Sequence, residues 1–406
     1  MISMEEAWDR IQRLATPLPT ERRAIDQAAG SVLAETVTAP MDLPPFDNSA
    51  MDGYALRAPD TQAARAEEPV KLTITGEVAA GGWREAPIAP GTAVKIMTGA
   101  AVPSGADAVL MLEAGRLRGD VVEIREPVPL GTHIRRRGED VRRGDVLLTE
   151  GLRLNAQRLG LLANSGISTV GVHRMPRVSL VATGSELVTD GRALQPGQIY
   201  DSNRIVLRTL VQQTGSVCEN LGIVPDDPSA IAQRLREGLT ADVLLVSGGV
   251  SVGAHDHVKD VLRDLGMDTL FWRVAMKPGK PILCGRLGAT WVFGLPGNPI
   301  SCVVGFLVFI EPLLRWLQGE AQASPRYGTA RLTASVRKKD DRRHFMTAGI
   351  EPSPDGCFEA TPTAQQGSAM MHSLAQANGF VVVPETCAEL AAGDKAQVLL
   401  FKESAQ

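Results

Sequence analysis

Apolar residues recur along this chain at two different spacings, and the spacing changes from region to region. Residues 1–15 place Ala7, Ile11 and Leu14 at helical intervals, which predicts an amphipathic helix. From about residue 70 to residue 150, short apolar runs such as VKLTITGEV alternate with Gly, Pro and Asp. That pattern predicts a small all-β module rather than helices.

Strand-like and helix-like segments alternate over residues 176–322, which is the pattern of a doubly wound α/β sheet. A further helix is predicted near residues 155–163. Residues 300–310 are nearly all apolar, but Glu311 and Pro312 follow at once, so this run predicts a buried helix too short to cross a bilayer. Beyond Pro325 the runs ARLTASV and GFVVVP return to a β pattern and predict a C-terminal β-barrel.

These patterns predict a multidomain α/β and β protein, and 406 residues suffice for two to four domains with separate cores. A discontinuous helical and extended domain comprises residues 1–50 and 146–175. The β module occupies residues 51–145, the α/β domain residues 176–322 and the β-barrel residues 323–406.

Composition and missing motifs exclude several classes of function. The chain is 44% apolar and 4% aromatic with a net charge of −4, so it lacks the basic excess and the stacking residues typical of nucleic-acid binding. The sequence contains neither GxxxxGK[ST] nor a GxGxxG after a strand, which argues against a P-loop enzyme and a dinucleotide site. Five scattered cysteines and an acidic N-terminal segment predict a cytoplasmic protein with free thiols and no membrane association.

Three apolar runs in the α/β region each end in a Gly-rich loop that carries an acid or a proline. RVSLVATGSE ends at Glu186, DVLLVSGGVSVGAHD at Asp256 and WVFGLPGNP at Pro299. An open α/β sheet binds ligands at the carboxyl ends of its strands, so these loops are expected around one crevice. Glycine permits close approach of a phosphate and carboxylates suit a hard cation, which predicts a phosphorylated ligand handled with a divalent metal.

The segment SGGVSVG, residues 247–253, has three interpretations. Gly249, Ser251 and Gly253 match G-x-S-x-G, the nucleophile elbow of a serine hydrolase. The elbow requires a helix directly after the serine, whereas GAHD intervenes here. An anion-binding turn is favoured, and an ordinary turn at the end of a strand is the third interpretation.

Acidic residues near the predicted strand ends have two possible roles. Asp201 and Asp227 are equally well explained as helix N-caps. Glu186 and Asp256 lie in loops without an evident capping role, which favours metal or substrate binding. Asp226 directly precedes Asp227 and joins the same group.

Basic residues supply the complementary charge. Lys277 and Lys280 lie on the proline-flanked turn MKPGKP, where two rigid ammonium groups would hold an oxyanion, although surface lysines are usually solvated. LPGNP, residues 295–299, predicts a helix N-terminus that favours negative charge. The arginine run in residues 133–145 is by default a solvated loop, or it reaches phosphates with bidentate geometry.

In chain order, the motifs PPFDNSAMDGYAL, KIMTGA, HIRRRGED, TGSEL, GQIYDSN, SGGVSVG-x-x-D, MKPGKP and LPGNP resemble the molybdopterin molybdenumtransferase (MoeA) family, stand-alone bacterial type. The resemblance implies insertion of molybdate into adenylylated molybdopterin with release of AMP and a requirement for Mg²⁺. It also implies a homodimer, in which residues 1–50 and 146–175 form the dimerisation domain and residues 51–145 a lid. The molybdopterin adenylyltransferase is a candidate partner.

The resemblance assigns site residues motif by motif. It implies catalytic roles for Asp52, Thr98, Glu186, Asp226 and Asp256, of which Glu186, Asp226 and Asp256 are the candidate metal ligands. The implied substrate-binding residues are Arg135, Gly248, Gly249, Ser251, Lys277, Lys280, Pro296, Asn298, Pro299, Arg342 and Ser373. The chain departs from the family pattern after Phe345, where Met346 and Thr347 stand in place of a basic residue.

Two other functions are compatible with parts of this pattern. Relatives fused to other modules act as structural proteins, so a non-catalytic pterin-binding scaffold is one alternative. A serine hydrolase that uses Ser251 is the other.

Overall fold

The computed structural model describes residues 1–189, 191–250 and 256–401, and these residues form two compact units. Unit 1 comprises Met1–Glu35, Glu150–Asn155 and Thr169–Gln406, and unit 2 comprises Thr36–Thr149 and Ala156–Ser168. The finer division of the chain into four domains stays a prediction.

The centre of unit 1 is a six-stranded sheet. Its order is β16 (Val217–Val224), β13 (Arg177–Thr183), β17 (Val243–Ser247), β21 (Thr290–Leu295), β20 (Leu283–Leu287) and β18 (Asp268–Trp272). β16, β13, β17 and β21 are parallel, whereas β20 and β18 complete the sheet in antiparallel fashion. The three loops that the sequence singled out, after β13, β17 and β21, therefore begin at one edge of the sheet.

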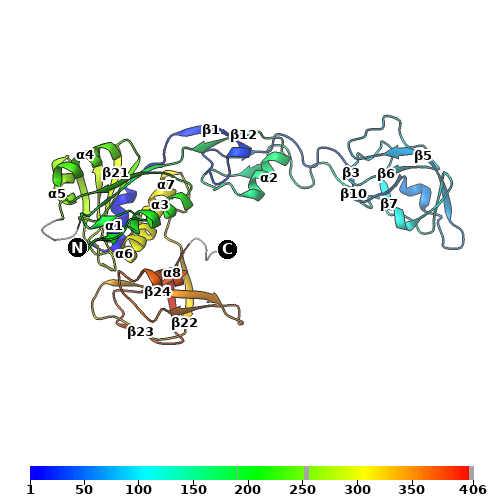
Figure 1. Cartoon of the computed structure of the whole chain (residues 1–406). Helices are drawn as coiled ribbons and strands as arrows, with labels where there is room; N and C mark the ends of the chain where they lie inside the picture. Colours follow the sequence, from blue (N-terminus) through cyan, green and yellow to red (C-terminus); the bar gives the residue numbers. More distant parts are fainter. Residues whose placement is uncertain (190, 251–255, 402–406) are drawn as a thin grey trace. The chain divides into compact units, whose positions relative to one another are not determined.

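Helices cover both faces of this sheet, as the doubly wound prediction requires (Figure 1). One face packs against α1 (Met4–Gln12), α3 (Asn203–Gln213), α6 (Pro299–Gly305) and α7 (Glu311–Leu317), and the other against α4 (Pro228–Gly238) and α5 (Val258–Asp264). Along β17, Val243 and Leu245 face the first core while Leu244 and Val246 face the second. This alternation is why the strand is apolar throughout.

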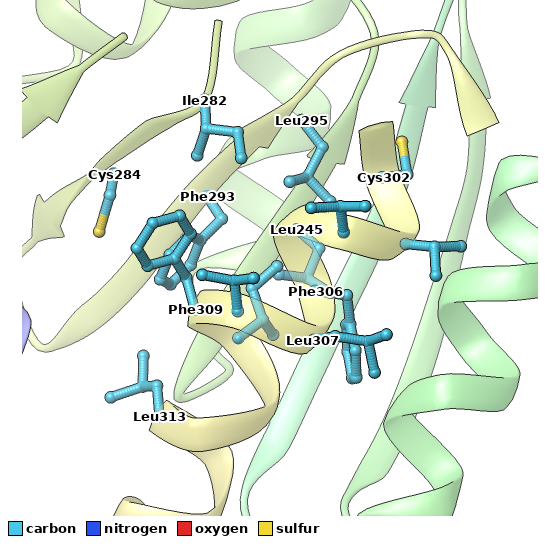
Figure 2. Close-up of a cluster of buried hydrophobic side chains, with 14 of the residues drawn as sticks. Leu245, Ile282, Cys284, Phe293, Leu295, Cys302, Phe306, Leu307, Phe309 and Leu313 are labelled. Carbon is cyan, nitrogen blue, oxygen red and sulfur yellow. The ribbon is translucent and has the colours of Figure 1, made fainter. Parts of the chain in front are cut away.

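The apolar run after LPGNP forms the main buried helix of unit 1. Figure 2 shows its side chains packed against residues of β17, β20 and β21, including Leu245, Cys284 and Phe293. The helix does not end at Glu311–Pro312 as the sequence suggested but continues to Leu317, through a π-helical turn at Phe306–Ile310. Pro312 lies just after the π-helical turn, and it lacks the N–H that would otherwise bond to the preceding turn. The run Pro299–Leu317 has the length and apolarity of a membrane span, yet 94% of its apolar 18-residue stretch is buried inside the protein.

The C-terminal part of unit 1 is a closed five-stranded β-barrel, as predicted. The ring runs through β24 (Arg343–Pro352), β25 (Phe358–Pro362), β22 (Tyr327–Leu332), β28 (Lys395–Leu400) and β26 (Gly379–Val383), which pairs with β24 again. The two-residue strand β19 (Met276–Lys277), from the α/β domain, pairs in parallel with β24. That pairing attaches the MKPGKP turn to the barrel.

Smaller elements complete unit 1. They are the strand pairs β1 (Thr20–Ala24) with β12 (Thr169–His173), β14 (Leu187–Val188) with β15 (Ile199–Tyr200) and β23 (Val336–Arg337) with β27 (Glu389–Leu390), the helix α8 (Met371–Gln376) and the single turn η1 (Ile25–Gln27).

Unit 2 is built around the predicted β module. Its sheet has the order β7 (Ala108–Met111), β4 (Gly53–Leu56), β6 (Thr92–Ile96), β5 (Val70–Val78), β9 (Val121–Ile124) and β8 (Gly115–Arg118). The strand pairs β10 (Ile134–Arg135) with β3 (Asn48–Ser49) and β11 (Val146–Leu148) with β2 (Val37–Thr38) accompany it, together with α2 (Ala156–Asn164), η2 (Ala58–Thr61) and η3 (Leu112–Ala114). Asp52 directly precedes β4 and Thr98 follows β6, so the antiparallel β4–β6 pair brings the two together.

Candidate active site

Two glycines at the end of β17 allow the sheet edge to pack closely. Gly248 and Gly249 both have positive φ, 95° and 66°. A Cβ atom on Gly248 would lie 2.4 Å from the carbonyl oxygen of Thr183 in β13, and one on Gly249 would lie 2.6 Å from Val258 Cγ2. Gly248 N–H also donates to the carbonyl of Leu295 in β21, over 2.9 Å. The turn therefore holds the ends of three parallel strands in register.

The acids after β13 and β16 lie in neighbouring loops. Ser185 N–H donates to Asp226 Oδ2 over 2.9 Å, and Asp226 N–H donates back to Ser185 Oγ over 3.0 Å. Glu186 folds over the backbone of Gly184, where an added Cβ would meet Glu186 Oε2 at 2.7 Å. Glu186 is exposed and Asp226 is half-buried. This pair of loops thus presents carboxylate oxygens at the sheet edge.

Asp227 and Asp201 have structural roles. Asp227 is the N-cap of α4 and accepts the Ala230 N–H over 2.8 Å. Asp201 is nearly buried and accepts hydrogen bonds from the backbone N–H and the guanidinium of Arg204. The capping interpretation of Asp227 is confirmed. The N-cap of α3 is Ser202, so Asp201 is not the N-cap and instead pairs with Arg204.

Asp256 is half-buried and lies two residues before α5. Ser251, the residue of the hydrolase interpretation, lies outside the described residues. Within the described ranges, no three His, Cys, Asp or Glu side chains gather into a group that could by itself hold a metal ion. A metal at this edge would therefore take some of its oxygen ligands from a bound phosphate or from water.

A cavity of about 600 Å³ opens beside the LPGNP loop, between the α/β domain and the barrel. The α/β domain contributes the MKPGKP turn, Pro296, Gly297, Asn298, Ile300 and Ser301, and the barrel side contributes residues 337–339, Arg342, His344–Thr347 and Gln366–Ser368. Lys277, Lys280, Arg337, Lys338, Lys339 and Arg342 all line it. No Asp or Glu of the described chain is among the lining residues, so the cavity favours an anion.

Asp340 organises the cations on the barrel side. Arg342 donates to both oxygens of Asp340, over 3.0 and 2.7 Å, and Lys277 Nζ lies 3.8 Å from Asp340 Oδ2. The hydrogen bonds from Arg342 hold the pKa of Asp340 well below its ordinary value. Burial lowers the pKa of His344, whose Nε2 lies 3.0 Å from Asp340 Oδ1. Asp340 therefore stays ionised and orients Arg342 without removing the positive charge of the cavity.

The remaining cations differ in their availability. The Lys338 ammonium donates to the carbonyls of Asp340, Arg342 and Glu385, over 2.9 to 3.0 Å, so it fixes the barrel loop. Lys277, Lys280 and Lys339 are exposed. The exposed lysines are the groups best placed to meet an incoming anion.

The LPGNP loop offers an anion fewer free backbone N–H groups than the sequence suggested. Asn298 is the N-cap of α6 and Pro299 its first residue, but the Ile300 N–H already donates to the carbonyl of Ser368, over 3.1 Å. Ser373 is buried in α8 and is not a lining residue of the cavity. The anion-binding character of this cavity thus rests on its side chains.

Thr347, where the family pattern has a basic residue, is buried in a neutral network. Its Oγ1 lies 2.6 Å from Thr363 Oγ1, and Gln366 Nε2 donates to its carbonyl over 2.9 Å. Gln366 also accepts the Thr347 N–H over 3.0 Å. This network fixes the segment that carries Gly367 and Ser368 on the cavity wall.

Unit 2 holds the other predicted residues. Thr98 donates to Asp52 Oδ1 through its backbone N–H and its Oγ1, over 2.7 and 2.8 Å. These two hydrogen bonds lower the pKa of the exposed Asp52, and the bond from the Thr98 backbone has the larger effect. Thr98 therefore orients an ionised Asp52 carboxylate at the end of strands β4 and β6.

Two of the five arginines in the run of unit 2 form ion pairs with acids of residues 40–48. Arg136 contacts Asp47 over 2.7 Å, and Arg137 contacts Asp42 over 2.6 Å. Arg135 is exposed and lines a cavity of about 510 Å³ together with Met41, Leu43, Pro44, Pro45, Asn48, Glu139, Asp140 and Asn164. The side chains of Arg136 and Arg137 are exposed, as the solvated-loop interpretation predicts, and they also pair with acids of the Pro-rich segment of residues 40–48.

Comparison with known proteins covers the whole chain. Residues 2–166 match the MoeA N-terminal region (domain I and II), residues 179–316 a probable molybdopterin binding domain and residues 329–401 the MoeA C-terminal region (domain IV). The molybdopterin molybdenumtransferase of Haemophilus influenzae is 36% identical, with 99% of each chain covered. Molybdopterin molybdenumtransferase 2 of Mycobacterium tuberculosis is 41% identical, with 92% of this chain and 93% of the relative covered.

The chain belongs to the molybdopterin molybdenumtransferase (MoeA) family. A crystal structure of the molybdopterin biosynthesis MoeA protein from Pyrococcus horikoshii has the same fold, with 33% identity, a TM-score of 0.83 and 99% of each chain covered. The strand-end acids lie in the molybdopterin-binding match, whereas the barrel wall of the cavity lies in the MoeA C-terminal match.

Several residues of this MoeA cavity were not anticipated from the sequence. Arg337, Lys338 and Lys339 line it, yet a charge run such as RKKDDRRH normally indicates a solvated surface. The only sequence signal was the density of that run just before the predicted strand at Phe345. Its role becomes evident once β24 is paired with β19.

Proposed function

We propose that this protein is a molybdopterin molybdenumtransferase, an enzyme that inserts molybdate into adenylylated molybdopterin and releases AMP in a Mg²⁺-dependent reaction. The observation that carries the proposal is the cation-lined cavity of about 600 Å³ beside the LPGNP loop, in a chain of the MoeA family. A volume of this order suits a small-molecule site.

Molybdate is a tetrahedral dianion, and the cavity offers it cations at fixed positions. In our proposal Lys277, Lys280 and Arg342 bind the oxyanion. Asp340 orients the Arg342 guanidinium, because it accepts two hydrogen bonds from that group. Pro296 and Asn298 form the rim on the α/β side.

The phosphates of the substrate would lie at the sheet edge, near Gly248 and Gly249. Positive φ at both glycines turns the chain sharply after β17, and in our proposal a phosphate approaches the backbone of this turn. The pterin-phosphate–AMP linkage is cleaved when water adds to phosphorus and the bridging oxygen leaves with the molybdopterin phosphate or with AMP. Insertion then forms two Mo–S bonds, and one molybdate oxygen leaves as water with the two thiol protons.

Mg²⁺ fits the donor chemistry of this edge. Asp226, Asp256 and Glu186 offer hard carboxylate oxygens, and one oxygen of Asp226 is already oriented by Ser185 N–H. Mg²⁺ is commonly held by one or two carboxylates together with substrate phosphates, so a closed protein cage is unnecessary. When bound, the ion would neutralise phosphate charge and polarise the phosphorus–oxygen bonds.

Two rival functions predict different results in one assay. The purified protein is incubated with adenylylated molybdopterin, molybdate and Mg²⁺, and AMP and active cofactor are measured. A pterin-binding scaffold would release no AMP. A serine hydrolase that uses Ser251 would keep its activity without Mg²⁺ and lose it to an acylating serine reagent.

The cavity itself is tested by Lys280→Ala, with Lys395→Ala as the control because Lys395 is an exposed lysine of β28 outside the cavity. We expect Lys280→Ala to raise the KM for molybdate at least about tenfold, as for loss of one charge-assisted contact of ~1.4 kcal/mol or more. Lys395→Ala should match the wild type. An unchanged KM for molybdate in Lys280→Ala would show that Lys280 and this cavity do not bind molybdate.

The proposal includes a homodimer, the molybdopterin adenylyltransferase as a candidate partner, and a cytoplasmic location. Free thiols at all five cysteines support a reducing compartment. Sedimentation analysis of the purified protein, alone and with the adenylyltransferase, tests both assemblies.

A further inference from the structure

Trp272 contacts the beginning of the segment that links β17 to α5. It is the last residue of β18 and is half-buried, and its indole N–H donates to the carbonyl of Val250 over 3.2 Å. Val250 is itself buried, and its Cγ1 lies 2.5 Å from the position that a Cβ on Gly294 in β21 would take. The carbonyl that accepts the indole bond is therefore part of a residue anchored on the sheet.

Trp272 also contacts the other end of this segment. Lys259, the second residue of α5, places its Nζ 3.8 Å from the centroid of the Trp272 ring. Arg273 Cζ lies 4.0 Å from the same centroid. Cations at this distance from an indole ring are attracted by its π electrons.

The backbone around Trp272 is held independently of these contacts. Arg273 has a φ of 72°, which is uncommon for a residue other than glycine. Its N–H donates to the carbonyl of Ile282 over 3.1 Å, and its carbonyl accepts the Ile2 N–H over 3.2 Å. The backbone next to Trp272 is thus held by hydrogen bonds that do not involve the Trp272 side chain.

The two ends of the segment also meet each other. Val258 N–H donates to the carbonyl of Gly249 over 3.2 Å, and the side chain of Val258 fills the space above Gly249. Asp256 lies between these two contacts in the sequence, two residues before Val258 and three before Lys259. Because Asp256 lies only two residues before α5, its backbone position follows that of the first turn of this helix.

We infer that Trp272 is a positioning residue that fixes Val250 and Lys259 relative to each other and thereby sets the place of the Asp256 carboxylate. The indole N–H of Trp272 donates to the Val250 carbonyl, and the indole ring contacts the Lys259 ammonium. The inference rests on the proposed function only for the role of Asp256. It assigns no contact between Trp272 and substrate.

The test compares Trp272→Phe with Trp316→Phe. Phenylalanine at 272 keeps a ring for Lys259 and Arg273 but removes the N–H donor. Trp316→Phe is the matched control, because it removes an equivalent bond, from Trp316 Nε1 to the Ala15 carbonyl over 3.0 Å, in α7. Trp272→Ala removes the donor and the ring together.

Hydrogen exchange is measured first, on the full-length protein without substrate. We expect the amide of Val258, whose N–H donates to the Gly249 carbonyl, to exchange about three- to tenfold faster in Trp272→Phe than in the wild type, as for loss of one neutral hydrogen bond. The increase should be larger in Trp272→Ala and absent in Trp316→Phe. Unchanged exchange in Trp272→Phe would overturn the inference whether or not the protein releases AMP.

Steady-state AMP release is measured next. We expect Trp272→Phe to lower kcat about three- to tenfold and to require more Mg²⁺ for half-maximal rate, with the KM for molybdate unchanged. A purely structural role would lower the yield of folded protein without a shift in the Mg²⁺ dependence. Faster exchange with a normal kcat and Mg²⁺ dependence would also overturn the inference. If the wild type releases no AMP, the proposed function fails, while the exchange experiment still decides whether Trp272 fixes the segment.

Discussion

Replacement of Gly248 by alanine tests whether close packing of the strand ends maintains the site. Gly248 has a φ of 95°, and an added Cβ would lie 2.4 Å from the Thr183 carbonyl oxygen. Gly266, just after α5, is the matched control: its φ is 88°, and nothing lies within 4 Å of an added Cβ. Both substitutions therefore incur the cost of positive φ, and only Gly248→Ala adds a contact.

The expected magnitudes follow from these distances. An L-residue at positive φ costs about 1–2 kcal/mol, so Gly266→Ala should lose about that much stability. Ordinary contact begins at 3.4 Å, so the Thr183 oxygen and the new methyl must separate by 3.4 − 2.4 = 1.0 Å. Overpacking of this kind costs about 1–3 kcal/mol more, which brings Gly248→Ala to about 2–5 kcal/mol.

Thermal unfolding and AMP release check these values. With about 2–4 °C of Tm per kcal/mol, Gly248→Ala should unfold at least about 2 °C below Gly266→Ala. A displacement of about 1 Å at the strand ends should also lower kcat by on the order of 100-fold, whereas Gly266→Ala should keep it. Equal Tm and equal kcat in the two variants would refute the packing argument.

Two further substitutions probe hydrogen bonds, one at the predicted pair of Asp52 and Thr98 and one between α3 and the strand ends. Thr98→Val removes one of the two hydrogen-bond donors that lower the pKa of Asp52. Because the pKa of Asp52 is lowered in the folded protein, the variant should show its full loss of stability above the ordinary aspartate pKa of about 3.9. The difference should vanish as the pH falls through the pKa of Asp52 in the folded protein. A Tm difference from the wild type that grows in acid would contradict this. Asn203→Ala removes the bonds from Asn203 Nδ2 to Ser247 Oγ and the Gly297 carbonyl, 3.0 and 2.8 Å, and should cost about 1–3 kcal/mol in urea unfolding. The exposed Gln233→Ala should be neutral, and equal stability of the two variants would show that this link is dispensable.

The strand-end loops were predictable because a local pattern determines them. The apolar runs of β13, β17 and β21 are parallel strands of one sheet, and their carboxyl ends must share an edge. Glu186, Asp226 and Gly248 could thus be grouped from the sequence. The fold class is confirmed for the same reason, since each element carries its own periodicity.

Long-range pairing was not predictable in the same way. The cavity exists because β19, only two residues long, pairs with β24 and brings Lys277 beside His344. Nothing in the local sequence specifies that register, so Arg337 and Lys339 resembled ordinary surface charges. Likewise, the bond from Ile300 N–H to Ser368 depends on where the barrel segment lies.

The pairing of β19 with β24 also limits how this protein can be dissected. Arg343 N–H donates to the Ala275 carbonyl over 3.0 Å, so the lysine-bearing turn shares its backbone bonding with the barrel. A truncated chain that stops after α7 would retain Lys277 and Lys280 in its sequence but lose the partner strand beside them. Fragments cut at the apparent domain border are therefore poor substitutes for the intact polypeptide in ligand-binding work.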